Sequence, residues 1–257
     1  MALLAGNWKL FKTRPDVEAF FKELEGLEIP ASHKCAVAPS PVLLETAVRA
    51  AKNTQSAIQI LSQNIAYKSE GAFTGEIGVK QLLELGVSGT LVAHSERRQF
   101  FGETDATAAE RCKIALENGL DVLFCIGENL EERRHGRFES VCESQLEEVL
   151  KVAGQFPKSM MTEKLIIAYE PVWAIGTGVT ANNQEIQDSH SFIHSFNLKA
   201  GYDLKILYGG SVKPDNFGAI SKTPHVSGAL VGGASLEAKS YKALLECLTR
   251  PLSSVNS

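Results

Sequence analysis

The sequence predicts an α/β protein folded as a single-domain (β/α)8 barrel over residues 1–257, with a short polar C-terminal tail. Two observations carry this prediction. Short apolar runs alternate eight times with segments of helical apolar spacing, and the runs are too apolar to leave one face in water. Strands buried on both faces indicate parallel strands surrounded by helices. An open, doubly wound sheet of eight strands is the structural alternative.

The expected strands are the short apolar runs. In chain order they are Ala2–Ala5, Cys35–Ala38, Ala57–Leu61, Thr90–Ala93, Asp121–Cys125, Leu165–Tyr169, Lys205–Tyr208 and Gly228–Val231. Between them, apolar residues recur at the spacing of a buried helix face. The expected helices are Val17–Leu24, Leu43–Ala51, Val79–Leu85, Ala106–Glu117, Glu139–Val152, Ile186–Phe196, Asp215–Ile220 and Leu236–Leu248.

Composition narrows the class of protein. Hydrophobic residues make up 44% of the chain and charged residues 22%, a balance typical of a globular protein with a sizeable core. The net charge of -4 and the lack of a Lys/Arg block argue against nucleic acid as a partner. A small anionic ligand stays compatible with this charge, because it needs only a local positive site.

Cysteine use and the chain ends favour a cytoplasmic location. Five cysteines, an odd number without a C-x-x-C pair, favour reduced thiols over a disulfide framework or a zinc ribbon. The residues before Gly6 are too few for a signal peptide. No apolar run approaches the ~18 residues of a membrane span. The Ser253–Ser257 tail carries no recognisable sorting signal.

Residues that can transfer protons or bind a substrate follow the expected strands, at the edge where barrel enzymes have their active sites. In strand order they are Asn7 and Lys9, Gln63 and Asn64, His94 to Glu96, Glu170, Gly209 to Ser211, and Gly232 and Gly233. A polar residue after a strand is usually only a turn former. An acid, an imidazole, an amine and two glycine clusters at one edge instead indicate an active site.

Glu170 is the candidate base, because it ends a buried apolar run and is followed by a stiffening proline. The segment Pro171–Gly178 (Pro171, Val172, Trp173, Ala174, Ile175, Gly176, Thr177 and Gly178) combines an apolar flap with two glycines that can absorb backbone rotation. Such a segment beside a carboxylate predicts a lid that closes over the acid and excludes water. An ordinary strand–loop–helix turn is the less specific interpretation.

The glycine clusters predict a phosphate site. Backbone N–H groups of Gly209–Ser211 and Gly232–Ser235 can point at one anion, helped by a following helix N-terminus and by Gly176. No Gly-Lys dipeptide is present, so the chain lacks a P-loop. The Gly176–Ala181 match to a dinucleotide pattern has little weight, because it follows the lid and not a strand.

His94 and Lys9 are the other candidate catalytic groups. His94 precedes Ser95, a plausible helix cap, and the positive helix end disfavours an imidazolium there. A neutral imidazole can donate a hydrogen bond to a substrate oxygen. Lys9 would balance phosphate charge and polarise a substrate oxygen, although a solvated lysine is the common alternative.

Three further features are better explained without a function. His190 and His194 lie four residues apart on an expected helix, but no third ligand accompanies them, so helix packing is favoured over a metal site. The charged run Glu131–Arg137 is typical of a solvated helix start. Cys125 lies among apolar residues, which favours a packed, inert thiol.

Combined over nearly the whole chain, the motifs resemble those of the triosephosphate isomerase family, whose fold is the TIM barrel. The matching segments are Gly6–Lys9, Gly71–Glu76, Ala93–Arg98, Cys125–Glu128, Ala168–Gly178, Tyr208–Val212 and Leu230–Leu236. The resemblance implies interconversion of dihydroxyacetone phosphate and D-glyceraldehyde 3-phosphate, in glycolysis and gluconeogenesis, without a cofactor or a metal.

The resemblance also implies roles for individual residues. Glu170 would carry the proton between C1 and C2, His94 would polarise the enediolate oxygens, Asn7 and Lys9 would stabilise charge, and Glu96 would support Lys9. The substrate and its phosphate would bind to Asn7, Lys9, Gly176, Ser211, Gly232 and Gly233. The family implies a homodimer in which the loop with Phe73, Thr74 and Glu76 enters the neighbouring subunit.

The chain departs from the family at a few positions. Leu10 and Phe11 replace a frequent Met-Asn, and Val179 lies at the far hinge of the lid, where it could alter lid kinetics. His194 and Ser227 occupy places where the family usually has Arg and Asp, so both halves of one ion pair are absent.

Two other classes of protein are alternatives to this family. A Schiff-base-forming phosphate barrel enzyme would need a lysine at the end of a central strand, where Glu170 stands here. A non-catalytic barrel that binds a partner would be expected to lack at least one of Lys9, His94 and Glu170. All three are present.

Overall fold

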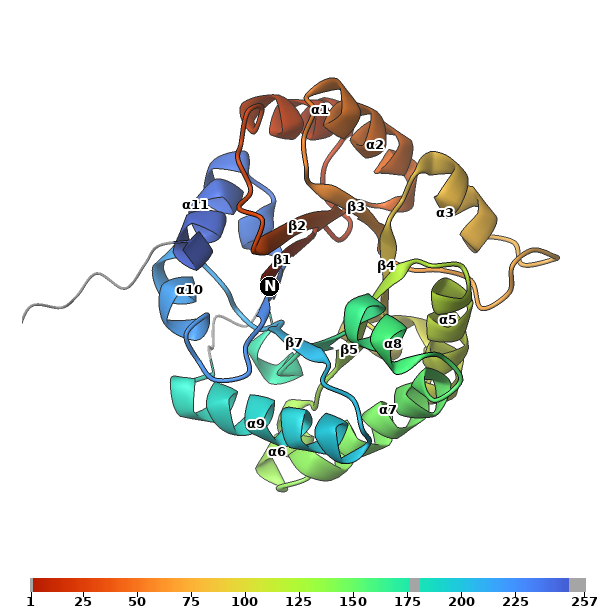
Figure 1. Cartoon of the computed structure of the whole chain (residues 1–257), viewed down its shortest axis with the longest axis vertical. Helices are drawn as coiled ribbons and strands as arrows, with labels where there is room; N and C mark the ends of the chain where they lie inside the picture. Colours follow the sequence, from red (N-terminus) through yellow and green to blue (C-terminus); the bar gives the residue numbers. More distant parts are fainter. Residues whose placement is uncertain (1, 176–180, 250–257) are drawn as a thin grey trace, which may run out of the picture.

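The strands form a closed parallel barrel with helices around it, and the predicted TIM barrel is confirmed (Figure 1). The computed structural model describes residues 2–175 and 181–249. The barrel runs in chain order from β1 to β8 and closes by pairing β8 with β1. The strands are β1 (Ala2–Asn7), β2 (His33–Ala38), β3 (Gln59–Ser62), β4 (Gly89–Val92), β5 (Asp121–Ile126), β6 (Leu165–Tyr169), β7 (Lys205–Tyr208) and β8 (Gly228–Val231).

The helices follow the strands and form the outer ring of Figure 1. They are α1 (Arg14–Glu23), α2 (Leu44–Asn53), α3 (Val79–Leu85), α4 (Ser95–Phe101), α5 (Asp105–Glu117), α6 (Leu130–Arg134), α7 (Phe138–Ala153), α8 (Lys158–Lys164), α9 (Asn183–Lys199), α10 (Pro214–Ile220) and α11 (Ala238–Thr249). Single 3-10 turns lie at η1 (Pro41–Leu43), η2 (Val172–Ala174) and η3 (Gly233–Ser235).

Three short helices, α4, α6 and α8, are absent from the eight expected helices. The sequence indicated α4 and α6 only as helix starts, at Ser95 and in the run Glu131–Arg137, and gave no sign of α8. The first strand is also longer than expected, because its pairing with β2 continues to Asn7 opposite Ala38. The prediction that residues 1–257 form one domain stays a prediction, and the C-terminal tail lies outside the described residues.

The core has two layers, because strand side chains alternate between the two faces of the barrel wall. Side chains that point inward fill the barrel, among them Leu61, Leu123 and Leu207. Side chains that point outward pack against the helices, and the largest of these regions includes Trp8 and Phe21. Both layers are almost fully buried.

Because all strands are parallel, their carboxyl ends meet at one rim of the barrel. The candidate active-site residues identified in the sequence follow these strand ends. The long loop before α3 projects outward from the ring of helices at the right of Figure 1. Among the described residues, no helix has the length and apolar character needed to cross a membrane.

Candidate active site

A cavity of about 750 Å³ opens at the carboxyl rim and contains most of the residues predicted from the sequence. It is large enough for a small phosphorylated substrate. Its lining includes Asn7, Lys9, His94, Glu170, Ile175, Gly209, Gly210, Ser211, Lys213, Gly232 and Gly233. The structure therefore brings together the acid, the imidazole, the amine and both glycine clusters.

Glu170 follows β6 directly and is almost completely buried, with 2% of its surface exposed. Its Oε1 lies 3.0 Å from His94 Nε2, and its Oε2 accepts a hydrogen bond of 2.9 Å from the Ser95 backbone N–H. Two glycines make room for it: a Cβ on Gly127 would lie 1.8 Å from the Glu170 carbonyl oxygen, and one on Gly209 would lie 2.9 Å from Glu170 Cγ. Glu170 therefore sits in a pocket that larger residues at these positions would fill.

The two side chains perturb each other's pKa. Burial alone lowers the pKa of the His94 imidazole, but the charge and hydrogen bond of Glu170 outweigh burial, and the net pKa is raised. Burial raises the pKa of the Glu170 carboxyl, but His94 and the Ser95 N–H outweigh it, and the net pKa is lowered. The His94 Nδ1 accepts from the Glu96 backbone N–H at 3.3 Å, a contact that favours an unprotonated Nδ1. The raised pKa of His94 thus depends on Glu170 staying in place.

Lys9 lies just past β1 and has φ +50°, an unusual value for a residue with a side chain. Its backbone N–H donates to Asn7 Oδ1 at 3.0 Å, and its Nζ contacts Glu96 Oε1 at 2.6 Å. Lys9 and Glu96, for which the resemblance implies a supporting role of Glu96, thus form a direct ion pair. Asn7 holds the lysine's backbone and lines the same cavity.

Gln63 is a site residue to which the sequence reasoning gave no role. Its Nε2 donates to the Lys9 carbonyl at 2.7 Å and to the Ala38 carbonyl at 2.9 Å. Together with Asn7 it fixes both sides of the strained Lys9 backbone. Its position directly after β3 was the available signal, because Glu170 likewise follows the last residue of β6 directly.

The glycine clusters follow β7 and β8, as predicted, and line one side of the cavity. Gly232 and Gly233 leave open space, since an added Cβ on Gly232 would meet nothing closer than Lys9 Cε at 3.6 Å. Ser211 donates from its Oγ to the Ala174 carbonyl at 2.7 Å. Its hydroxyl therefore contacts the candidate lid in this state.

The candidate lid begins with the 3-10 turn Val172–Ala174. Trp173 donates from its indole Nε1 to Glu128 Oε1 at 2.9 Å, and the Tyr169 hydroxyl lies 3.2 Å from both Glu128 oxygens. Burial raises the pKa of the Glu128 carboxyl, with Trp173 opposing that change. The predicted lid residues Gly176, Thr177 and Gly178, and the hinge residue Val179, lie outside the described residues.

The predicted interface residues lie in the projecting loop between β3 and α3. The Phe73 ring packs edge-on against Tyr67 at 5.4 Å between centroids, and Thr74 is exposed. Glu76 pairs with Arg111 of α5 at 2.9 Å. The loop is thus anchored to the barrel at Glu76 and presents Thr74 outward.

The features set aside in the sequence do not form a site. His190 is buried with Nδ1 3.4 Å from the His225 carbonyl, whereas the His194 ring stacks on the His225 ring at 4.0 Å. Burial raises the pKa of the Cys125 thiol well above its usual value. Within residues 2–175 and 181–249, no group of three or more metal-ligating side chains could hold a metal ion.

His194 and Ser227, the two positions where the family usually has an ion pair, contact other residues in this structure. The His194 Nδ1 lies 3.9 Å from Asp203 Oδ1, and its ring lies on His225. The Ser227 backbone pairs with Ile206 and Leu3. In the part of the chain that the structure describes, the side chains of His194 and Ser227 form no hydrogen bond or ion pair with each other.

Comparisons with known proteins agree with this geometry. A family model described as Triosephosphate isomerase matches residues 2–248. The chain is 42% identical over 255 residues to the triosephosphate isomerase of Solibacter usitatus, which covers 95% of this chain and 98% of the relative. It is 41% identical over 249 residues to that of Trichlorobacter lovleyi, covering 95% of this chain and 97% of the relative. The enzyme of Geobacter metallireducens is 42% identical over 249 residues, with the same coverage.

Proposed function

The chain belongs to the triosephosphate isomerase family, and from this premise we propose that it interconverts dihydroxyacetone phosphate and D-glyceraldehyde 3-phosphate. One observation carries the proposal. The buried carboxylate of Glu170 and the imidazole of His94 lie 3.0 Å apart in one cavity that Lys9 and two glycine clusters also line. Such a cavity offers a base, a hydrogen-bond donor and an anion site to one small substrate.

Glu170 is the base in this proposal. It removes a proton from C1 of the ketose, which leaves an enediol(ate), and returns a proton to C2 to give the aldose. In the conformation described, its oxygens are bound to His94 and the Ser95 N–H. The carboxylate therefore has to leave these two partners before it can reach a substrate carbon. Proton transfer by a positioned base typically contributes ~10²–10⁴-fold to the rate.

His94 supplies the hydrogen-bond donor. Once Glu170 turns to the substrate, the contact that raises the pKa of His94 weakens, while burial and the Glu96 N–H continue to favour the neutral ring. Its Nε2–H is then available to the substrate oxygens on C1 and C2. A neutral imidazole in this role and a closing lid are established features of the family.

Lys9, Asn7 and Glu96 organise charge beside the reacting oxygens. The Lys9 ammonium is held by Glu96 at 2.6 Å, a geometry suited to stabilising negative charge. The substrate phosphate lies against the backbone N–H groups of the Gly209–Ser211 and Gly232–Gly233 segments. The Pro171–Gly178 lid, including Gly176, closes over it.

The alternative functions have less support. A Schiff-base enzyme needs a free lysine amine, whereas Lys9 is ion-paired with Glu96. The other lysine that lines the cavity, Lys213, lies at the N-cap of α10. A binding protein without catalysis would have no use for a buried Glu170–His94 pair.

A coupled assay tests the proposal directly. The purified protein is mixed with dihydroxyacetone phosphate, and formation of the aldehyde is followed by a coupling enzyme. We expect turnover that inorganic phosphate inhibits competitively. Glu170→Gln purified in the same way measures any contaminating isomerase. A folded parent protein whose rate does not exceed that of this variant would overturn the proposed function.

We further propose that the enzyme works as a cytoplasmic homodimer. The projecting loop with Phe73, Thr74 and Glu76 would enter a second copy near Lys9 and His94, and α4 exposes the large rings of Phe100 and Phe101. All five cysteines are free, as expected of a reducing compartment. Sedimentation at micromolar concentration is expected to show a dimer, and a fully active monomer would contradict this assembly.

A further inference from the structure

Ala93, the residue between β4 and His94, has a strained backbone. Its φ is +63°, in the left-handed region, where an L-residue is disfavoured by about tenfold in population. This conformation turns the chain so that the next two residues face Glu170. His94 Nε2 then lies 3.0 Å and the Ser95 N–H 2.9 Å from its carboxylate oxygens. The geometry of the catalytic pair therefore depends on how Ala93 is held.

Glu103 holds Ala93 from the turn that follows α4. Its Oε1 accepts the Ala93 backbone N–H at 2.9 Å, while Arg98 donates from Nε to the Ala93 carbonyl at 3.0 Å. Ala93 itself is 1% exposed, so its N–H has no access to water if this acceptor is lost. A change at Glu103 would thus free the strained residue to rotate, and His94 would move with it.

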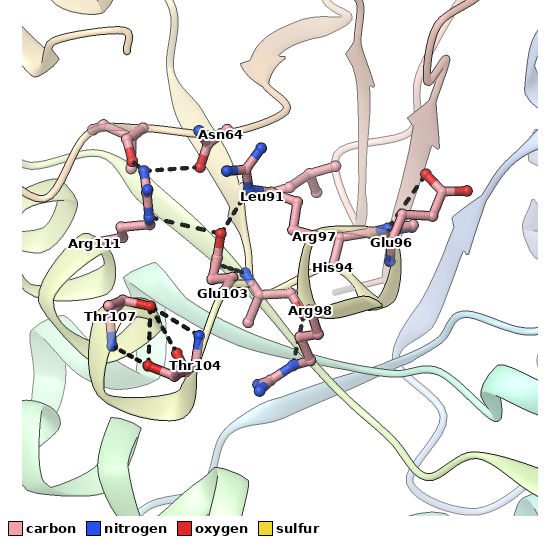
Figure 2. A network of polar contacts seen from close by, with 12 residues as sticks. Asn64, Leu91, His94, Glu96, Arg97, Arg98, Glu103, Thr104, Thr107 and Arg111 are labelled. Atoms are coloured by element: carbon pink, nitrogen blue, oxygen red, sulfur yellow. Dashed lines mark hydrogen bonds and ion pairs between the residues drawn. The ribbon is translucent and has the colours of Figure 1, made fainter. Parts of the chain in front are cut away.

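Glu103 is in turn fixed by two arginines (Figure 2). Its Oε2 accepts from Arg97 Nε at 2.6 Å and lies 3.6 Å from Arg111 Nε, and its side chain is 1% exposed. Arg111 reaches across to Glu76 and to Asn64 after β3. Figure 2 shows the carboxylate between these two guanidinium groups. Glu103 does not line that cavity and has no direct contact with His94 or Glu170 in the described structure.

We propose that Glu103 is a positioning residue for the isomerisation: by binding the Ala93 N–H it keeps that residue left-handed and so aims His94 and the Ser95 N–H at Glu170. This inference rests on the proposed function. In this role Glu103, although it is buried outside the cavity, affects kcat through the φ torsion of Ala93. Binding of the substrate phosphate, which involves the loops after β7 and β8, is not affected.

The test is a cycle of four proteins: the parent, Glu103→Met, Ala93→Gly and the double variant. Met fills a similar space without a strong acceptor for the Ala93 N–H, whereas the amide oxygen of Gln could still accept it. In the parent background we expect Glu103→Met to lower kcat by about tenfold or more, with KM changed by less than about threefold. In the Ala93→Gly background the same substitution should lower kcat by less than about threefold, because glycine adopts a positive φ at no steric cost. Equal losses in the two backgrounds, or a loss confined to KM, would overturn the proposal.

Asp121→Leu, which likewise replaces a buried carboxylate by an apolar side chain, is the matched control. Asp121 is also a buried carboxylate in ion pairs, with Lys164 at 2.8 Å and Lys34 at 3.9 Å, but it begins β5 at the opposite rim. It should lower stability and leave kcat unchanged. An equal fall in kcat for this variant would show that the Glu103 effect is a general consequence of losing a buried ion pair.

Three further situations are also decisive. If Glu103→Met does not fold, recovery of folding and of kcat in the double variant supports the coupling, and a double variant that is equally unfolded overturns it. An inactive but folded parent would count against the proposed function itself. If the parent is active and the effects of the two substitutions on kcat are additive, only the role of Glu103 is overturned.

Discussion

Two buried histidines, His94 and His190, show how neighbouring charge decides what burial does to an imidazole. His94, at the carboxyl rim, faces Glu170 at 3.0 Å, and its pKa is raised. His190, on α9, packs edge-on against Tyr169 and contacts the His225 carbonyl, and burial lowers its pKa to about 4. The two pKa shifts differ in direction because His94 contacts the carboxylate of Glu170, whereas the described contacts of His190 include no carboxylate.

This difference teaches why one histidine is a candidate catalytic group and the other is not. His94 has a donor nitrogen aimed at a carboxylate, and its proton affinity changes when that carboxylate moves. The Nε2 of His190 has no hydrogen-bond partner among the described residues, so the ring stays neutral at physiological pH. His190 therefore packs α9 against the barrel wall, and it lowers the stability of the folded protein in acid.

The largest expected effect comes from removing the carboxylate that distinguishes His94. We expect Glu170→Gln to lower kcat by at least ~10²–10⁴-fold, because an amide cannot accept the substrate proton. Substrate analogues should still bind, since the phosphate loops are unchanged. Steady-state kinetics with an inhibition constant for inorganic phosphate measures both.

The same variant sharpens the comparison between the histidines. With Glu170 neutralised, the interaction that raises the pKa of His94 is lost, and its pKa should fall toward that of a buried, unpaired imidazole. Glu84→Gln, on the exposed face of α3, serves as the control and should keep parental kcat. A Glu170→Gln enzyme within a few-fold of the parent would exclude Glu170 as the base.

The next effect concerns stability in acid and depends on His190. Its folded pKa of about 4 lies below the unfolded value near 6.5. The unfolded chain therefore binds a proton first as pH falls, and folding stability is lost between about pH 6.5 and 4. The loss from this one group is about 3 kcal/mol, and above pH 6.5 it vanishes.

We expect His190→Gln to reduce that acid-induced loss of the free energy of unfolding by a similar amount. Urea unfolding at several pH values between 7.5 and 4.5 measures it. His135→Gln removes an exposed histidine at the end of α6 and should reproduce the parental pH dependence. Parallel curves for the parent and His190→Gln would show that His190 is protonated as easily in the folded protein as in the unfolded chain.

The fold was predictable because the barrel depends on features that repeat along the chain. Apolar runs and helical spacing located all eight strands and most helices. Because parallel strands run in the same direction, the polar residues that follow them were expected together at one rim. Glu170, His94 and Lys9 could be identified for the same reason. Glu170 directly follows β6, and His94 and Lys9 lie two residues past the ends of β4 and β1.

The parts that could not be predicted depend on contacts between distant segments. Gln63 reaches the Lys9 carbonyl from the neighbouring loop, and Glu103 reaches the Ala93 N–H from the far end of α4. Neither residue type signals this use, because Gln and Glu are common in turns. The positive φ values of Lys9 and Ala93 are equally invisible in sequence, since neither residue is glycine.

The smallest expected effect concerns His194 and Ser227. His194 stacks on His225, two residues before Ser227, and lies near Asp203. If Arg and Asp are introduced together at 194 and 227, the two charges can pair, whereas Asp alone at 227 lacks this partner and Arg alone at 194 has only Asp203 nearby. A cycle of His194→Arg, Ser227→Asp and the double variant should show favourable coupling of about 0.5–3 kcal/mol in the free energy of unfolding. Additive stabilities would mean that the two positions do not meet, and kcat should stay constant throughout.

The most direct test of the account is isomerisation in deuterium oxide. If Glu170 carries the proton through an enediol(ate), part of that proton exchanges with solvent. Aldehyde made from dihydroxyacetone phosphate should then contain deuterium at C2, by NMR or mass spectrometry. In Glu170→Gln, isomerisation and deuterium incorporation should fall together. Product that forms at the parental rate with no deuterium, or incorporation that survives in Glu170→Gln, would contradict proton transfer by this carboxylate.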